Sequence, residues 1–376
     1  MMVKRVLLGL AMVAVAIGSE FALPVIIPDI AFRQLVMTAL VSVIIALSLN
    51  VINGMAGQFS IGHAGFVGIG AYTSAIVSSH IHQSLGARDF TFAHSFLVMP
   101  AAIVAAALIS GFFGFLVGLP SLRLKGDYLA IVTLGFAEII RLLIATASPN
   151  STEGVSALLG QLGGQQGYGG PDDTGVAQYA GPFWIVGGVL FMIVFSWRLK
   201  FSGWGRALRA LREDEIAASA VGVDPTSYKV TSFVISAMGA GVAGALLACM
   251  RDGNPTVQPE QFNFFFSFDA ITMVIIGGSG SVSGAVLGGL FVTLTVKAIE
   301  QLQRLDAVEA FRAVHPDFDL NALRMVVYAA VLILLMVLRP SGIFGESEIV
   351  KRKKPDLPPP SRGPGPGSAR AEEATA

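Results

Sequence analysis

The chain has 376 residues, of which 53% are hydrophobic and 13% charged, and its formal net charge is zero. A soluble domain carries about 25% charged residues, so this composition excludes a water-soluble protein and predicts an all-α polytopic membrane protein. The neutral balance gives no signal for nucleic acid binding, and the single Cys249 excludes an internal disulfide framework. The phosphate-binding pattern GxxxxGK[ST] is absent, so we expect no ATP hydrolysis by this chain.

Apolar runs long enough to approach or cross a hydrocarbon core of about 30 Å recur along the chain. We interpret ten of them as transmembrane helices: Val6–Ile27, Gln34–Ile52, Ser60–His80, His94–Leu119, Tyr128–Ala147, Pro182–Leu199, Val230–Met250, Phe264–Gly278, Ser283–Ile299 and Ala322–Leu338. The eighth run is short and meets the ninth across GGSGSVSG (Gly277–Gly284). This pair could therefore be one broken or re-entrant element.

The positive charges predict the orientation of these spans. With ten spans, 17 of the 25 Lys and Arg residues fall on one side and six on the other, while Arg141 and Lys297 lie within spans. The positive-inside rule then places both termini in the cytoplasm. We expect a transmembrane permease domain at 1–345, with an external loop at about 148–180 and a cytoplasmic loop at about 200–229. The Pro- and Gly-rich segment 346–376 is predicted to be a disordered cytoplasmic tail.

The stretch NGMAGQFSIGHAGFVGIGAY (Asn53–Tyr72) is unusually rich in glycine for a membrane helix. Helices in lipid associate through close backbone approach, which small residues allow. Two stripes of small residues fit this: one runs through Ser60, Ala64, Gly68, Ala71 and Ala75, and the other through Ser236, Ala240 and Gly244, with Ala237 and Gly241 beside it. We expect turn residues at Asn53-Gly54 and Gly57-Gln58 to break the helix at the cytoplasmic edge.

Several residues of this stretch are candidates for the translocation path or for helix packing: Asn53, Gly57, Ser60, His63, Ala64 and Gly68. His63 has three interpretations. It could be a packed histidine bonded to a neighbouring carbonyl, a residue that lines or gates a path, or a metal ligand. The first is favoured, and no second His or Cys stands three or four residues away to support the third.

Glu138 and Arg141 lie in the middle of the fifth span, three residues apart and on one helical face. Ionisable groups at that depth are expensive unless paired, so we interpret them as an intramembrane ion pair. A proton relay or contact with a zwitterionic substrate remain alternatives. Asp269, Lys297 and Glu300, near the ends of the eighth and ninth spans, are interpreted as boundary residues.

The cytoplasmic loop at 200–229 is the longest charged stretch between spans. Arg206, Arg209 and Glu213 are spaced three and four apart, which predicts a short amphipathic helix, and a turn follows at Gly222 and Asp224-Pro225. The loop could be a solvated connector or a helix that docks on a cytoplasmic partner.

Four stretches in order resemble the permease family of bacterial branched-chain amino acid ABC importers, and the LivM-type subunit in particular. They are the pattern N-G-x-x-G-Q-x-S-x-G-H-A-x-F from Asn53, KGDYLAIVTLGFAEIIRLL (Lys125–Leu143), GRALRALREDEIAASAVGVDPTSYK (Gly205–Lys229) and FDAITMVIIGGSGSVSGAVLGG (Phe268–Gly289). In the third, Glu215, Ala217, Ala218 and Gly222 match the coupling motif E-A-A-x-x-x-G, although Ile216 stands at its second position.

The resemblance implies a transport subunit in the bacterial inner membrane, without cofactor or catalytic residues. Its implied partners are a second, homologous permease, two ATP-binding subunits that hydrolyse ATP, and a periplasmic solute-binding protein. Relatives are associated with branched-chain amino acids, but also with urea and short amides. The alternative of another class is a self-sufficient, proton-coupled secondary transporter. A membrane-embedded enzyme is disfavoured because HExxH, GxSxG and paired carboxylates on separate spans are absent.

Overall fold

The computed structural model describes residues 2–86, 90–121, 127–147, 160–171 and 175–302, together with Ala330, Ile333, Leu334, Val337, Gly342 and Glu348. Over these residues the structure is built from helices, with two isolated β-bridges, Tyr168–Val257 and Ala180–Met250. The elements are α1 (Met2–Ile26), α2 (Ile30–Asn50), η1 (Val51–Met55), α3 (His63–Ser84), α4 (Phe92–Ser121), α5 (Asp127–Ala145), η2 (Gly164–Gln166), α7 (Pro182–Lys200), α8 (Gly203–Glu213), α9 (Glu215–Ala220), α10 (Pro225–Ala248), η4 (Pro259–Phe262), α11 (Phe264–Gly277) and α12 (Val282–Leu302).

Six of these helices, α1, α2, α4, α5, α7 and α10, are long and apolar enough to cross a membrane. This supports the predicted class, an all-α polytopic membrane protein. Helix α3 has 22 residues but is less apolar than these six, because it carries glycine, serine and histidine, and it is largely buried. The tenth predicted span (322–338) and most of the predicted tail lie outside the described residues, as do parts of the external loop.

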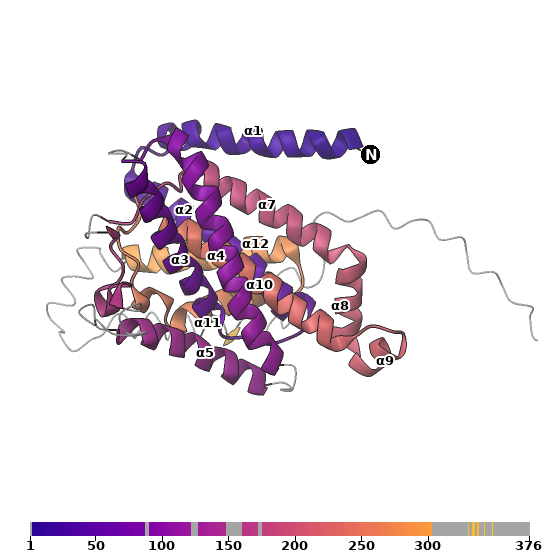
Figure 1. Cartoon of the computed structure of the whole chain (residues 1–376). Coiled ribbons are helices and arrows are strands. Elements are labelled where there is room, and N and C mark those ends of the chain that lie inside the picture. Colours follow the sequence, from indigo (N-terminus) through magenta and orange to yellow (C-terminus); the bar gives the residue numbers. More distant parts are fainter. Residues whose placement is uncertain are drawn as a thin grey trace, which may run out of the picture.

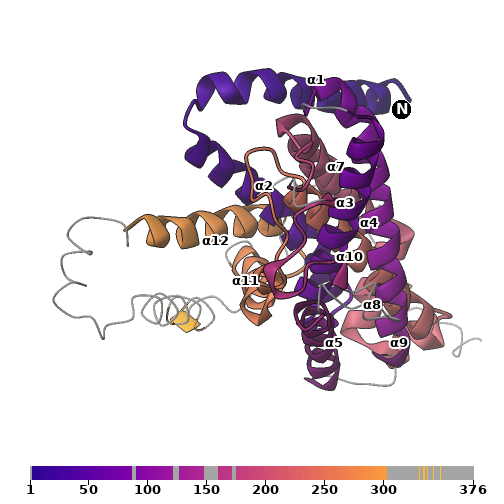
Figure 2. The ribbon, with the colours of Figure 1, turned by 60° about the vertical axis from the view of Figure 1, so that its left-hand side comes forward.

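Helix α2 lies at the centre of the bundle and α1 at its edge (Figures 1 and 2). Every residue of α2 from Val41 to Asn50 is buried. Helix α1 packs mainly along α7 and exposes large apolar side chains, among them Phe21 at 67% and Val25 at 78%. Such a continuous exposed apolar surface suits lipid rather than water.

Helices α3, α4 and α10 pack closely because glycine faces glycine or bare backbone. A Cβ on Gly244 of α10 would lie 2.1 Å from the carbonyl oxygen of Val67 in α3. A Cβ on Gly70 would lie 2.4 Å from the carbonyl oxygen of Gly241. The predicted stripe in the seventh span is therefore confirmed as a packing surface at Gly241 and Gly244.

The stripe predicted from Ser60 is wrong at its first member, because α3 begins only at His63. Gly57 has a φ of +69°, which ends the preceding helix, and Gly62 stands at the N-cap of α3. Ser60 thus lies in a non-helical segment, although it is buried. Further along α3, Gly68 packs against the Phe262 ring. A Cβ on Gly68 would lie 3.2 Å from Cγ of Phe262.

The eighth and ninth predicted spans form an antiparallel helical hairpin, α11 and α12. A Cβ on Gly277 would lie 2.1 Å from the Gly284 carbonyl oxygen, and one on Gly288 would lie 2.0 Å from that of Met273. Helix α11 has 14 residues, about 21 Å at 1.5 Å per residue, and is therefore shorter than a hydrocarbon core of about 30 Å. The pair is two helices joined by a tight turn.

The close approach of α3 and α10 yields a stability prediction. Gly244→Ala forces a methyl group against the α3 backbone, so we expect a loss of at least the roughly 1–3 kcal/mol of an overpacked core. Gly135→Ala on α5 is the matched control, because nothing lies within 4 Å of its Cβ position. Thermal unfolding of the purified protein in detergent should show a lower midpoint for Gly244→Ala alone. Equal midpoints for the two variants would contradict this packing.

Candidate functional site

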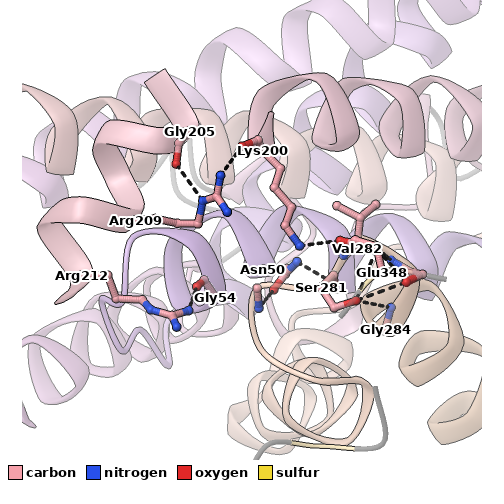
Figure 3. Close-up of polar contacts among 12 residues, drawn as sticks. Asn50, Gly54, Lys200, Gly205, Arg209, Arg212, Ser281, Val282, Gly284 and Glu348 are labelled. Atoms are coloured by element: carbon pink, nitrogen blue, oxygen red, sulfur yellow. Dashed lines mark hydrogen bonds and ion pairs between the residues drawn. The ribbon is translucent and has the colours of Figure 1, made fainter. Parts of the chain in front are cut away.

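The candidate site is a polar junction where the helices of the loop at 200–229 meet two breaks in the apolar helices (Figure 3). The first break is the segment 51–62, which follows α2. Its first five residues form a π-helix, and residues 56–62 are not helical. The predicted break is therefore confirmed at Gly57-Gln58, whereas Asn53-Gly54 lie inside the π-helix.

Side chains from several helices satisfy the freed backbone groups of this first break. Asn53 Oδ1 accepts a hydrogen bond from the Ser60 N–H at 3.2 Å. Thr133 Oγ1 of α5 accepts one from the Ile61 N–H at 3.1 Å. Ser267 Oγ of α11 accepts one from the Ala64 N–H at 3.1 Å. These bonds remove the penalty of unpaired buried backbone and tie the break to α5 and α11.

The second break is the turn between α11 and α12, and Asn50 joins it to the first. Asn50 is fully buried at the end of α2. Its Oδ1 accepts a hydrogen bond from the Gly280 N–H at 2.8 Å, and its Nδ2 donates to the Ser281 carbonyl at 3.1 Å. Gly54 lies against the same turn, since a Cβ there would be 2.3 Å from Gly280 N. One amide side chain thus holds both breaks together.

Helix α8 reaches the first break through arginine. Arg212 Nη1 donates to the Gly54 carbonyl at 2.7 Å. The methylene groups of Arg212 cover Gly57, where a Cβ would lie 2.4 Å from Cγ. Arg209 donates to the carbonyl oxygen of Lys200 at 3.3 Å, which ties α8 to the end of α7. A displacement of α8 would therefore also displace the end of α7 and the first break.

The turn between α11 and α12 also binds a carboxylate from beyond the last predicted span. Glu348 forms an ion pair with Lys200 at 2.5 Å, and both side chains are only 6% exposed. Its oxygens accept hydrogen bonds from the N–H groups of Val282 (2.8 Å) and Ser283 (3.1 Å), the first residues of α12. Gly342 touches the same turn: a Cβ there would lie 2.5 Å from Gly278 Cα.

These contacts set the ionisation of Glu348. Burial alone raises its pKa, but the bonds from Lys200, Val282 and Ser283 together bring the pKa of Glu348 below its usual value. The carboxylate is also favoured by its place at the N-terminus of α12. Glu348 therefore remains ionised and paired at neutral pH.

The predicted coupling residues lie on α9 and the turn after it. Asp214 caps α9 by accepting hydrogen bonds from the N–H groups of Ile216 and Ala217, both at 2.9 Å, so the loop forms two helices instead of the one predicted. Glu215 pairs with Lys229 of α10 at 2.7 Å, and Ala218 is buried against its own chain. These two residues help to hold α9 in place.

The exposed surface of this region includes two large apolar side chains. Ile216 is 83% exposed and Val221 80% exposed. They flank Ala217 and Gly222, which are also exposed; Gly222 has a φ of +89° and nothing within 4 Å of its Cβ position. Because the sequence analysis treated Ile216 only as a departure from a motif, it missed this side chain as a candidate contact.

The other predicted residues are packing or paired residues. His63 is buried, its Nε2 lies 2.9 Å from Ser48 Oγ of α2, and it also bonds to the backbone of Ile45, as expected for a packed histidine. Among the residues that the structure describes, no group of three or more His, Cys, Asp or Glu could hold a metal ion. Glu138 and Arg141 form the predicted ion pair at 2.8 Å on α5.

Sequence reasoning also missed an ion-pair cluster at the opposite end of the bundle. Glu20 of α1 is buried, pairs with Arg251 at 2.6 Å and accepts a hydrogen bond from the Phe183 N–H at the start of α7. Beside it, Arg33 pairs with Asp252 at 2.6 Å. A single carboxylate inside the first apolar run was the available signal, because such a group needs a partner.

The Lys200–Glu348 pair yields a prediction with an internal control. Lys200→Met leaves a buried carboxylate unpaired, a loss of roughly 3–5 kcal/mol in comparable sites, whereas Lys200→Met/Glu348→Gln removes both charges. We expect the single variant to have the lower unfolding midpoint in detergent. Equal unfolding midpoints for the single and the double variant would show that the ion pair does not stabilise the folded protein.

The same pair predicts a pH dependence. Because the folded-state pKa of Glu348 is lowered, its stabilising contribution is present at neutral pH and is lost as the pH falls through that lowered value. The gap in unfolding midpoint between the wild-type chain and Glu348→Gln should therefore shrink on acidification. A gap that stays constant down to the lowest pH at which the protein remains soluble would contradict this.

Comparison with known proteins identifies the family to which the chain belongs. Residues 31–336 match the model of the family described as the permease component of branched-chain amino acid transport systems. The chain is 33% identical to the high-affinity branched-chain amino acid transport system permease protein LivM of Salmonella typhimurium and to that of Escherichia coli. Each alignment covers 91% of this chain and 75% of the relative.

The high-affinity branched-chain amino acid transport system permease protein LivH of Escherichia coli is 26% identical over 82% of this chain and 92% of its own length. No solved structure matches the chain. The family match covers most of the chain. The two LivM relatives are more than 30% identical to it, and the alignments cover more than two thirds of their length. The chain therefore belongs to the family of permease components of branched-chain amino acid transport systems.

Proposed function

We propose that this chain is the transmembrane permease subunit of an ATP-driven ABC importer that moves branched-chain amino acids across the bacterial inner membrane. It would work with a second, homologous permease, two ATP-binding subunits and a periplasmic solute-binding protein. The observation that carries the proposal is the junction of α8 with the breaks at 51–62 and 278–281. It gives a cytoplasmic partner a mechanical connection to the membrane helices.

The proposed topology has ten spans with both termini in the cytoplasm. Its support is the bias of Lys and Arg residues, 17 against six. The exposed apolar side chains Ile216 and Val221 of the loop at 200–229 are what a docking surface for an ATP-binding subunit requires.

The proposed mechanism derives from these contacts. When ATP binding closes the ATP-binding subunits, α9 moves with the surface on which it docks. Helix α8 carries this displacement to Gly54 through Arg212, and Asn50 passes it to the turn of the α11–α12 hairpin. Reorientation of that hairpin changes the side from which the path is open. This chain contributes the path and the lever, and performs no covalent chemistry.

The sequence alternatives receive less support. A proton-coupled transporter would need a carboxylate whose protonation opens a path, but Glu138 is paired with Arg141 of its own helix. Urea and short amides lack a charged ammonium and carboxylate, so they would not make use of the opposite charges of Glu260, Asp269 and Lys297, which line one cavity.

The docking surface yields a transport prediction. Ile216→Glu adds a charge to an exposed apolar contact, so we expect uptake of leucine by the complete transporter to fall at least about tenfold, since a buried unpaired charge commonly destabilises contacts by more than the 1.4 kcal/mol that this represents. Thr226→Glu is the matched control, because it adds the same charge nearby at the exposed N-terminus of α10, where it is tolerated.

A second pair of variants separates bulk from backbone strain. Gly222→Arg and Gly222→Ala share the strain of a positive φ, but only Gly222→Arg adds a large side chain to the surface. We expect Gly222→Arg to abolish ATP-dependent uptake while Gly222→Ala retains most of it, with both proteins reaching the membrane. Normal uptake by Gly222→Arg would rule out docking through this surface.

A further inference from the structure

A cavity of about 500 Å³ lies between α2, η4, α11 and α12. Sites for small molecules are typically about 300–1,000 Å³, and this cavity falls inside that range. Two smaller cavities on the same side of the bundle measure about 220 and 240 Å³ and fall below it. Of the three, this one is large enough for a solute of the size of an amino acid.

Both signs of charge line this cavity. Glu260 comes from η4, Asp269 from α11 and Lys297 from α12. Asp269 and Lys297 are boundary residues by sequence alone, but the fold brings them to one cavity.

The remaining wall of the cavity offers an apolar surface. Ile45 of α2, Met273 of α11 and Val292 of α12 line it, and each is less than 7% exposed. Such side chains suit an aliphatic group, whereas the charges suit an ammonium and a carboxylate. The lining as a whole is therefore complementary to a small zwitterion with an apolar side chain.

The cavity continues into a second, smaller one. The neighbouring cavity of about 240 Å³ shares Thr38, Gln261 and Phe266 with it. At its other end this second cavity is lined by Asn254 and Thr256, in the segment between α10 and η4. Together the two cavities form a track along α2 that is lined by both polar and apolar side chains.

The same hairpin that forms one wall of the cavity carries the cytoplasmic junction at its turn. Asn50 and Glu348 bind the turn at 278–281 and the start of α12, while Asp269 and Lys297 lie further along the two helices. A movement of the turn is therefore accompanied by a change in the shape of the cavity.

We propose that this cavity is the solute-binding stretch of the translocation path, with the ammonium group beside Glu260 and Asp269 and the carboxylate beside Lys297. The inference rests on the proposed function, and it names the chemical class of the solute: an α-amino acid zwitterion with an aliphatic side chain. Selection takes place by charge at one wall and by apolar contact at the other.

The test is cysteine labelling in the complete transporter, reconstituted in nanodiscs. In a Cys249→Ala background, Thr38→Cys places a thiol on both cavities, and Ser84→Cys places one at the exposed end of α3, outside them. A maleimide reagent is added with and without millimolar leucine. We expect leucine to slow the labelling of Thr38→Cys several-fold and to leave the labelling of Ser84→Cys unchanged.

Variants of Lys297 then test the assignment of charge. In the Thr38→Cys background, Lys297→Met should raise the leucine concentration that gives half-protection by about tenfold or more, because a hydrogen bond to a charged group is lost. Lys297→Arg should retain most of the protection. Leucinamide, which has no carboxylate, should protect equally weakly with and without Lys297→Met.

Two results would overturn the inference: leucine that does not slow the labelling of Thr38→Cys, or protection that Lys297→Met leaves unchanged. ATP-dependent leucine uptake by the unmodified transporter is measured in parallel. If uptake is present and protection absent, the cavity assignment fails and the proposed function stands. If the unmodified transporter takes up no leucine, the proposed function fails and this inference fails with it.

Discussion

The structure depends on one constraint: backbone groups that leave a helix inside a membrane must find partners without water. This chain breaks its helices at 51–62 and at 278–281, and side chains supply those partners. Asn50 serves the second break, while Thr133 and Ser267 serve the first. Each of these side chains comes from a different helix, so the hydrogen bonds that satisfy the backbone also fix how α2, α5 and α11 pack against one another.

Further contacts link the two breaks to α7 and α8. Arg212 brings helix α8 into contact with the first break, and Lys200 and Glu348 bring the end of α7 and the chain beyond the last predicted span onto the hairpin turn. Between these points the helices pack glycine against backbone, with little room to deform. In the proposed mechanism, a displacement of α9 is therefore transmitted to α11 and α12, where the charged cavity lies.

Much of this could be predicted from sequence because it is local. Apolar length located the nine helical runs that fall in the described part of the chain, and the glycines at Gly54 and Gly57 located the first break. The junction could not be predicted, because it joins residues such as Lys200 and Glu348 that are 148 positions apart. For the same reason Asp269 and Lys297 looked like boundary residues until the hairpin placed them on one cavity.

The central claim is that the junction transmits work from the cytoplasmic helices to the path. Asn50→Ala tests it most directly, because Asn50 is wholly buried and cannot itself touch a cytoplasmic subunit. The measurement is the number of ATP molecules hydrolysed for each leucine taken up by the reconstituted transporter. The account predicts that Asn50→Ala leaves ATP hydrolysis in place and raises this ratio about tenfold or more, which corresponds to the loss of roughly 1.4 kcal/mol of coupling. An unchanged ratio in a folded, assembled variant would contradict it.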